Sequence, residues 1–296
     1  MKKVKFEGIF PAMAVPFDRE GALDIDGIKE NVRFFADAGC AGVVCNGSTG
    51  EAVNLTREER KAVIMATKEA AGGRLVVIAG TGGPTTNVTL EYTRDAMDAG
   101  AEAVLVITPF NAIPNKEGLY RHFAEVAQLG VPVILYNLPQ HTGVEIDLDT
   151  LVRLADLDHI VGIKESSGNF SYFAELMRVF GDKLTVFTGC DDGTLQAFCC
   201  GARAAILALG NIAPRMLVDM LEAVDRGDLV RARDIYYRLL PIARAISSSV
   251  NFPAPVKEAV RLLGRPSSAP RLPILPVDPE ESASIRKALV FAGLMR

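Results

Sequence analysis

Short apolar segments alternate with longer amphipathic segments through the first 208 residues, and this alternation is the feature that most constrains the fold. The apolar segments are rich in Val and Ile and show no polar alternation. Parallel strands that are covered on both faces have this character. We predict strands at residues 9–15, 42–45, 75–79, 103–107, 133–136, 160–164, 185–188 and 204–207. We predict helices between them at residues 28–38, 57–71, 86–99, 116–128, 148–155, 171–180 and 193–200.

The regular spacing of these units predicts a closed barrel. Successive strands begin about 20–35 residues apart, which is one βα unit each, and eight such units without a break are typical of a (β/α)8 TIM barrel of the α/β class. An open doubly wound sheet is the structural alternative. It is disfavoured because no G-x-G-x-x-G follows the first predicted strand, which runs into Val15-Pro16-Phe17-Asp18.

Almost 90 residues follow the last predicted strand, and their pattern is helical. Helices are expected from residue 214 onward and at 229–246, 255–263 and 279–292. One of them should be the eighth barrel helix. We therefore expect a barrel domain at residues 1–224 and a C-terminal helical extension at residues 225–296.

Composition and charge narrow the class of partner. The chain is 49% hydrophobic, its net charge is -4 and its pI is about 5.6. This balance disfavours nucleic acid or an anionic membrane as the main partner. No apolar run reaches the roughly 20 residues of a membrane span, and no apolar stretch follows the basic start as in a secretory signal. Together with five cysteines, an odd number, this favours a cytoplasmic protein with reduced thiols and a small-molecule partner.

Two polar side chains end neighbouring predicted strands, where a barrel carries its active site. Lys164 follows four apolar residues, and Tyr136 ends the preceding strand. A desolvated amine loses its charged form and can attack a carbonyl, while a phenol beside it can transfer protons. Lys164 could instead be solvated or paired with Glu165, and Tyr136 could be a core aromatic.

A glycine-rich turn after the second strand is a candidate carboxylate site. It reads Asn46-Gly47-Ser48-Thr49-Gly50-Glu51, so two glycines flank two hydroxyls. Backbone N–H groups in such a turn can bind an anion, although an ordinary βα loop is the alternative. The turn lacks the P-loop pattern, and Gly80-Thr81-Gly82-Gly83 lacks dinucleotide spacing.

Metal and cofactor chemistry have little support in the sequence. The three histidines lie apart, without the spacing of metal ligands, and no G-x-S-x-G elbow is present. We therefore expect no metal and no cofactor, and a cofactor-free reaction on a carbonyl compound is the simplest interpretation.

These motifs together resemble those of the dihydrodipicolinate synthase / N-acetylneuraminate lyase family, which are class I Schiff-base aldolases. The resemblance covers nearly the whole chain. It is carried by Gly47-Ser48-Thr49-Gly50-Glu51, Tyr136-Asn137-x-Pro139, Gly162-Ile163-Lys164-Glu165 with Ser167-Gly168, and Pro255-Val256-Lys257 followed by Arg271-Leu272-Pro273.

The resemblance implies a role for individual residues. Lys164 would form the imine with pyruvate or another 2-keto acid, and Tyr136 would transfer protons. Ser48 and Thr49 would bind the carboxylate, with Ser48 also near the proton relay. Gly189 and Ile206 would line the pocket through their backbones. The family also implies a homotetramer built as a dimer of dimers.

Two positions depart from the pattern of the synthases. His141 stands where the synthases usually have an arginine that binds the carboxylate of the aldehyde substrate, and Phe110-Asn111 replaces two tyrosines. Histidine is shorter than arginine and lacks its fixed charge. We hypothesise that His141 and Asn111 face the hydroxyls or the leaving group of another substrate; the alternative is that both merely fill the pocket wall.

The leading functional prediction is therefore an aldolase or dehydratase that acts on a hydroxylated 2-keto acid, such as a 2-keto-3-deoxy sugar acid or a 4-hydroxy-2-oxo acid. Three alternatives stay open. One is a 4-hydroxy-tetrahydrodipicolinate synthase that condenses pyruvate with aspartate semialdehyde. The others are an N-acetylneuraminate lyase and a non-catalytic barrel that binds a keto acid as a sensor.

Overall fold

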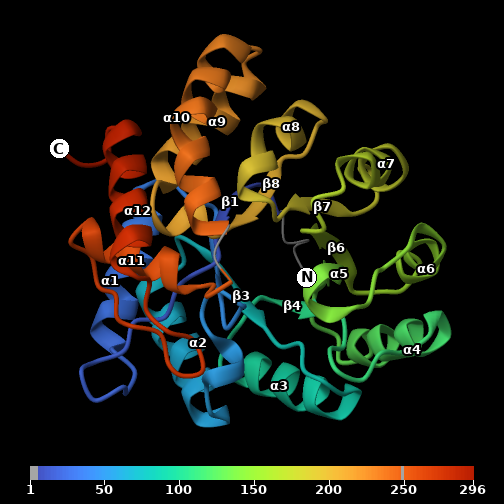
Figure 1. The fold of residues 1–296 in the computed structure, drawn as a ribbon. Helices are drawn as coiled ribbons and strands as arrows, with labels where there is room; N and C mark the ends of the chain where they lie inside the picture. The colour runs from blue at the N-terminus through green and yellow to red at the C-terminus, as the bar shows by residue number, and fades with distance from the viewer. Residues whose placement is uncertain (1–5, 248–249) are drawn as a thin grey trace.

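Eight parallel strands form one sheet that curls into a barrel, with helices around its outside (Figure 1). The computed structural model describes residues 6–247 and 250–296. The strand order is β1-β8-β7-β6-β5-β4-β3-β2, and β1 meets β2 at a single parallel bridge between Ala12 and Val44. This confirms the predicted (β/α)8 architecture with a C-terminal helical part.

The strands agree closely with the predicted segments because their Val- and Ile-rich residues are buried on both faces. Their bounds are β1 (Gly8–Pro11), β2 (Gly42–Cys45), β3 (Val76–Gly80), β4 (Ala103–Ile107), β5 (Val133–Asn137), β6 (Ile160–Glu165), β7 (Thr185–Thr188) and β8 (Ala204–Leu207). The prediction for β1 ran four residues too far. Beyond Pro11 the chain leaves the β8 ladder and makes only the bridge to Val44.

The helices of the barrel units begin mostly at side-chain caps. Thr56 and Glu59 form a capping box at the start of α2. Asp24 caps α1, which begins at Ile25, three residues earlier than predicted. The helices are α1 (Ile25–Asp37), α2 (Arg57–Ala71), α3 (Thr86–Asp98), α4 (Lys116–Ala127), α5 (Pro139–Thr142), α6 (Leu148–Leu154), α7 (Phe170–Phe180) and α8 (Thr194–Cys199). The short α5 was not predicted, and it places His141 on a helical turn rather than in a loop.

The C-terminal residues form the expected helices. They are α9 (Pro214–Asp225), α10 (Leu229–Ser247), α11 (Ala254–Leu262) and α12 (Pro279–Phe291). In Figure 1 these orange and red helices lie together on one side of the barrel, where α10 packs against α9 and α12. A division between residues 224 and 225 remains a proposal. Among the described residues, no helix is both long and apolar enough to cross a membrane.

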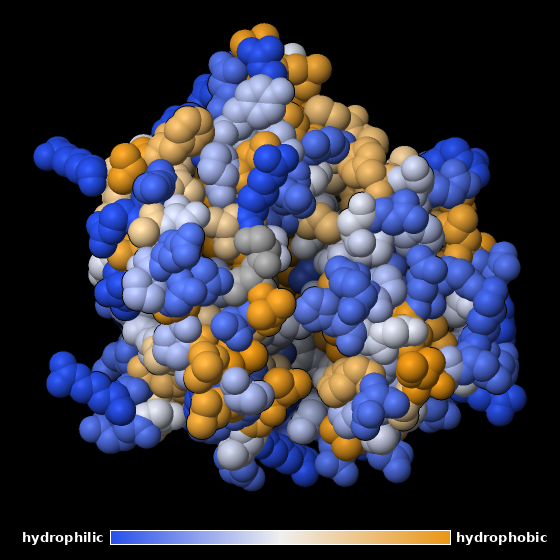
Figure 2. Space-filling view, in the orientation of Figure 1, coloured by the Kyte–Doolittle hydropathy of each residue, from blue (hydrophilic) through white to orange (hydrophobic). Residues whose placement is uncertain are grey.

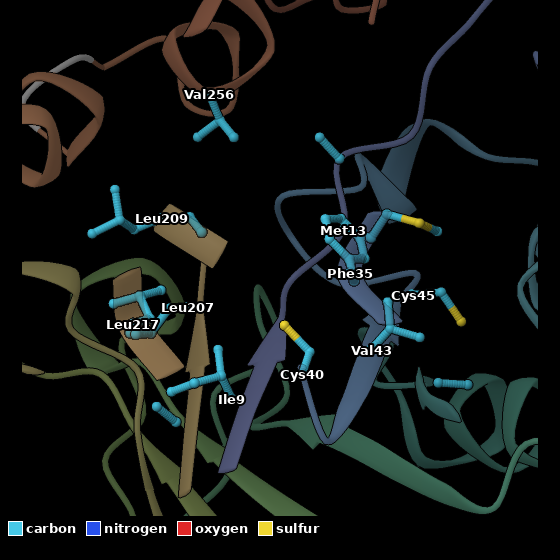
Figure 3. Packing of buried hydrophobic residues seen from close by; sticks show 14 of the residues in the cluster. Ile9, Met13, Phe35, Cys40, Val43, Cys45, Leu207, Leu209, Leu217 and Val256 are labelled. Carbon is cyan, nitrogen blue, oxygen red and sulfur yellow. The ribbon is translucent and has the colours of Figure 1, made fainter. Parts of the chain in front are cut away.

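Two buried clusters position the site. The larger lies between the strands and the helices, and Figure 3 shows part of it, including Val256 of α11, Leu209 and Met13. The smaller fills the barrel interior, where the rings of Phe6, Phe10 and Phe187 pack at centroid distances of 5.6–6.3 Å. The centre of the barrel is therefore filled by packed side chains.

Candidate active site

A large cavity lies at the carboxyl ends of the strands, as expected for this fold. Its volume is about 630 Å³, and a side cavity of about 280 Å³ adjoins it through shared lining residues. Figure 2 shows the surface hollowed near the centre of this face. The main cavity is large enough for a small substrate with several functional groups.

Lys164 and Tyr136 lie side by side in this cavity. They are directly paired in the ladder between β6 and β5, and both side chains are more than nine-tenths buried. The Lys164 Nζ lies 4.1 Å from the centroid of the Tyr136 ring. Both line the main cavity, so the amine and the phenol that the sequence singled out meet in one site.

Gly189 leaves room for the Lys164 side chain. A Cβ at position 189 would lie 2.6 Å from the Lys164 Cε and 1.9 Å from the Ser166 Oγ, far inside contact distance. Ser166 lines the same cavity, and its buried hydroxyl has no hydrogen-bond partner among the described residues. Gly189 thus lines the cavity as predicted, and Ser166 was missed because nothing marked it beyond its place two residues after Lys164.

The glycine-rich turn reaches the cavity with its hydroxyl residues. Ser48 is exposed and lines both cavities, while Thr49 is buried and lines the main one. Asn46 and Glu51 bracket the turn, and both have left-handed backbone, at φ 55° and 54°. Few non-glycine residues adopt this conformation, so surrounding contacts must hold the turn in place.

The remaining predicted site residues divide into two groups. His141 is exposed and lines both cavities. Asn111 is exposed, has φ 72°, and is not among the described residues that line either cavity. Ile206 is fully buried in the barrel interior and likewise does not line them.

Asp191 is an acidic lining residue that the sequence analysis missed. It follows β7, two residues after Gly189, and its Oδ1 accepts a hydrogen bond of 2.7 Å from the Leu209 N–H. Burial raises the pKa of Asp191 to about 6, while this hydrogen bond and the charge of Lys164 oppose the rise. Its position just past a strand was the available signal.

The described residues contain no group of three or more His, Cys, Asp and Glu side chains placed to hold a metal ion. Lys164 is the only lysine or arginine among the described residues that line the main cavity. The site therefore combines one buried amine, a phenol, several hydroxyls and two carboxyls, Asp191 and Asp192. Such a set can form an imine with a keto acid and move protons around it.

Comparisons with known proteins agree with this geometry. A family model described as the dihydrodipicolinate synthetase family matches residues 5–292. A 4-hydroxy-tetrahydrodipicolinate synthase from Methanothrix thermoacetophila is 41% identical over 286 residues, which are 96% of either chain.

Solved structures give the same result. The dihydrodipicolinate synthase from Aquifex aeolicus is 35% identical with a TM-score of 0.93, covering 98% of this chain and 99% of its own. The enzyme from Acinetobacter baumannii, solved in complex with pyruvate, is 32% identical with a TM-score of 0.95, covering 98% and 100%. The chain therefore belongs to the dihydrodipicolinate synthetase family and is an enzyme of the class I Schiff-base lyases.

Proposed function

We propose that this enzyme forms an imine between Lys164 and the keto carbon of pyruvate, and that it condenses the resulting enamine with aspartate semialdehyde. The observation that carries the imine is the buried Lys164 amine beside the Tyr136 ring, in a cavity that Ser48 and Thr49 also line. The second substrate is supported by the names of the relatives, which are 4-hydroxy-tetrahydrodipicolinate synthases. This reverses the order of the sequence-based hypotheses, in which the synthase was an alternative.

The proposed chemistry assigns one task to each group. The neutral Lys164 amine attacks the keto carbon, and the carbinolamine loses water to give the protonated imine. Tyr136 moves protons during this dehydration. The imine makes the C3 protons acidic, so loss of one gives an enamine that attacks the aldehyde carbon of the second substrate. Ser48 and Thr49 hold the pyruvate carboxylate through hydroxyl and backbone N–H groups.

The imine is tested by reducing it with borohydride in the presence of pyruvate and locating the adduct by peptide mass spectrometry. We expect it on Lys164. Lys164→Arg keeps the charge and should abolish the adduct, while Lys183→Arg, at an exposed lysine paired with Asp156, should leave it unchanged. An adduct on another lysine, or none with any 2-keto acid, would overturn the assignment.

A second candidate reaction, cleavage or dehydration of a hydroxylated 2-keto acid, is favoured by the charge of the cavity. A carboxylate on the second substrate would find no lysine or arginine besides Lys164 among the described lining residues, whereas Ser166 and Asp191 could bind hydroxyls. His141, rather than Asn111, is then the residue proposed to face that substrate. The rate at which the enzyme consumes aspartate semialdehyde in the presence of pyruvate should exceed the rate at which it releases pyruvate from 2-keto-3-deoxy acids. The opposite order of rates would favour the second candidate reaction.

The role of His141 is tested by adding the missing charge. Because an arginine binds a carboxylate through two charge-assisted hydrogen bonds, His141→Arg should lower the KM for aspartate semialdehyde about tenfold if the condensation is correct. His159→Arg, at an exposed histidine just before β6, is the matched control.

The proposal also includes a cytoplasmic homotetramer, a dimer of dimers. Exposed apolar side chains support an interface, among them Val53, which lines the side cavity, and Ile113. Light scattering should give four times the chain mass of 31.8 kDa.

A further inference from the structure

A fully buried ion pair links the glycine-rich turn to the C-terminal helices. The Lys257 Nζ of α11 contacts the Glu51 Oε1, and both side chains are only 1% exposed. The two residues are 206 positions apart in the sequence. The pair thus joins a barrel loop that lines the cavity to a segment that follows the barrel.

The Glu51 carboxylate is held on its other side as well. Its Oε2 accepts a hydrogen bond of 2.8 Å from the Arg271 N–H and one of 3.3 Å from the Asn54 amide. The Glu51 N–H itself donates to the Ser48 carbonyl at 3.1 Å. Glu51 is therefore connected directly to the backbone of a residue that lines both cavities.

Lys257 is fixed just as firmly. Its Nζ donates to the Ser268 Oγ at 3.3 Å and to the Ala269 carbonyl at 3.5 Å, and it lies 4.2 Å from the centroid of the Phe17 ring. The neighbouring Val256 packs in the large core cluster (Figure 3). Burial lowers the pKa of Lys257, and the Glu51 charge opposes this effect.

Stability alone gives little reason to keep such a pair. Desolvating two charges costs about as much as their attraction returns, and well-packed apolar replacements are often neutral or stabilising. What the pair does supply is a fixed position for Glu51, whose left-handed backbone is otherwise unfavourable. Ser48 and Thr49 lie within three residues of that fixed point.

We propose that Glu51 and Lys257 are positioning residues that hold the Ser48–Thr49 turn in the conformation that binds the substrate carboxylate. The C-terminal extension, through Lys257 and the Arg271 backbone, thereby sets the affinity of the enzyme for its keto acid. This inference rests on the proposed function, because it assigns the carboxylate to that turn.

The test measures the pyruvate concentration that gives half-maximal borohydride trapping on Lys164, alongside KM and kcat. We compare Glu51→Gln, Lys257→Met and the double variant with the parent. A loosened turn should raise the half-saturating pyruvate concentration and the KM for pyruvate about tenfold or more, because small misplacements of binding groups weaken binding strongly. The kcat at saturating substrate should change less than about threefold. Glu69→Gln, which breaks the exposed pair with Lys29, is the matched control.

The double variant keeps the test decisive if a single change unfolds the protein. Removing one partner leaves a buried charge unpaired, whereas removing both charges leaves none, so the double variant should remain folded by circular dichroism. Parent-like half-saturation in any folded variant would show that the pair only supports the fold. Absence of an adduct on Lys164 in the parent would instead overturn the proposed function, and this inference with it.

Discussion

Asn137 donates a hydrogen bond of 2.6 Å to the Glu165 carboxylate, one residue beyond the ladder pair of Tyr136 and Lys164. Its Oδ1 accepts a second hydrogen bond of 3.0 Å from the Ile146 N–H. Both Asn137 and Glu165 are buried, and burial raises the pKa of Glu165 although the hydrogen bonds to it oppose the rise. One amide thus connects the ends of β5 and β6 just where they carry the amine and the phenol.

Asn137→Ala should therefore lower both stability and activity. It leaves the Glu165 Oε2 and the Ile146 N–H without their partner, although the Glu165 Oε1 keeps its hydrogen bond of 2.5 Å from the Ser167 N–H. Each buried unsatisfied group costs about 1–3 kcal/mol, or more when charged. We expect a loss of about 3–5 kcal/mol in the free energy of unfolding, measured by denaturant titration. Asn115→Ala, which removes an exposed helix cap, should cost only about 1 kcal/mol. Equal losses in the two variants would contradict this account.

Gly189→Ala should reduce activity while leaving the fold intact. The new methyl would occupy the space of the Lys164 Cε and the Ser166 Oγ, so Lys164 must move. A displacement near 1 Å can cost about 100-fold in rate, and we expect a loss of that order in kcat/KM. In Gly193→Ala the nearest atom, the Cys190 Cβ, would be at 3.5 Å, an ordinary contact, so this variant is the control. A fully active Gly189→Ala enzyme would contradict the assigned position of Lys164.

The barrel and its reactive pair could be predicted because they depend on local pattern. Buried parallel strands need continuous Val and Ile, and the rule that sites lie at strand ends then selects Tyr136 and Lys164. Their ladder pairing confirms the predicted neighbourhood. The ends of the strands were also predicted well, except for β1, which ends at Pro11 rather than at Val15.

Features that depend on distant contacts could not be predicted in this way. Asp191 looks like any loop aspartate until Leu209, from the next barrel unit, donates to it. The pairing of Glu51 with Lys257 requires the path of the C-terminal segment. The departures at His141 and Asn111 placed a hydroxylated 2-keto acid first, whereas the names of the relatives favour the synthase alternative. The structure also places Asn111 outside the described lining of both cavities.

Asp191→Asn should stabilise the protein at neutral pH. The pKa of Asp191 is about 6 in the folded state against a usual 3.8, so ionisation is less favourable in the folded state than in the unfolded state. The resulting penalty is absent below pH 3.8, grows as pH rises, and is complete above pH 6. Two pKa units correspond to about 3 kcal/mol, and partial exposure reduces this to about 1–3 kcal/mol. Denaturant titrations at pH 4 and pH 7.5 measure the difference in the free energy of unfolding between variant and parent. Asp192→Asn, at an exposed aspartate, is the control. A difference that does not grow with pH would contradict the prediction.

His122 should make the protein less stable in mild acid. It is buried between α3 and α4, where its Nδ1 bonds the Thr86 hydroxyl at 3.0 Å and its Nε2 has no partner among the described residues. Burial lowers the pKa of His122 to about 4, so between pH 6.5 and 4 the unfolded chain binds a proton that the folded chain does not. Stability is unaffected above pH 6.5 and falls by about 2 kcal/mol at pH 5. His122→Gln should remove this part of the acid sensitivity, whereas His159→Asn, at an exposed histidine, should not. An unchanged pH slope in His122→Gln would show that other groups govern the acid response.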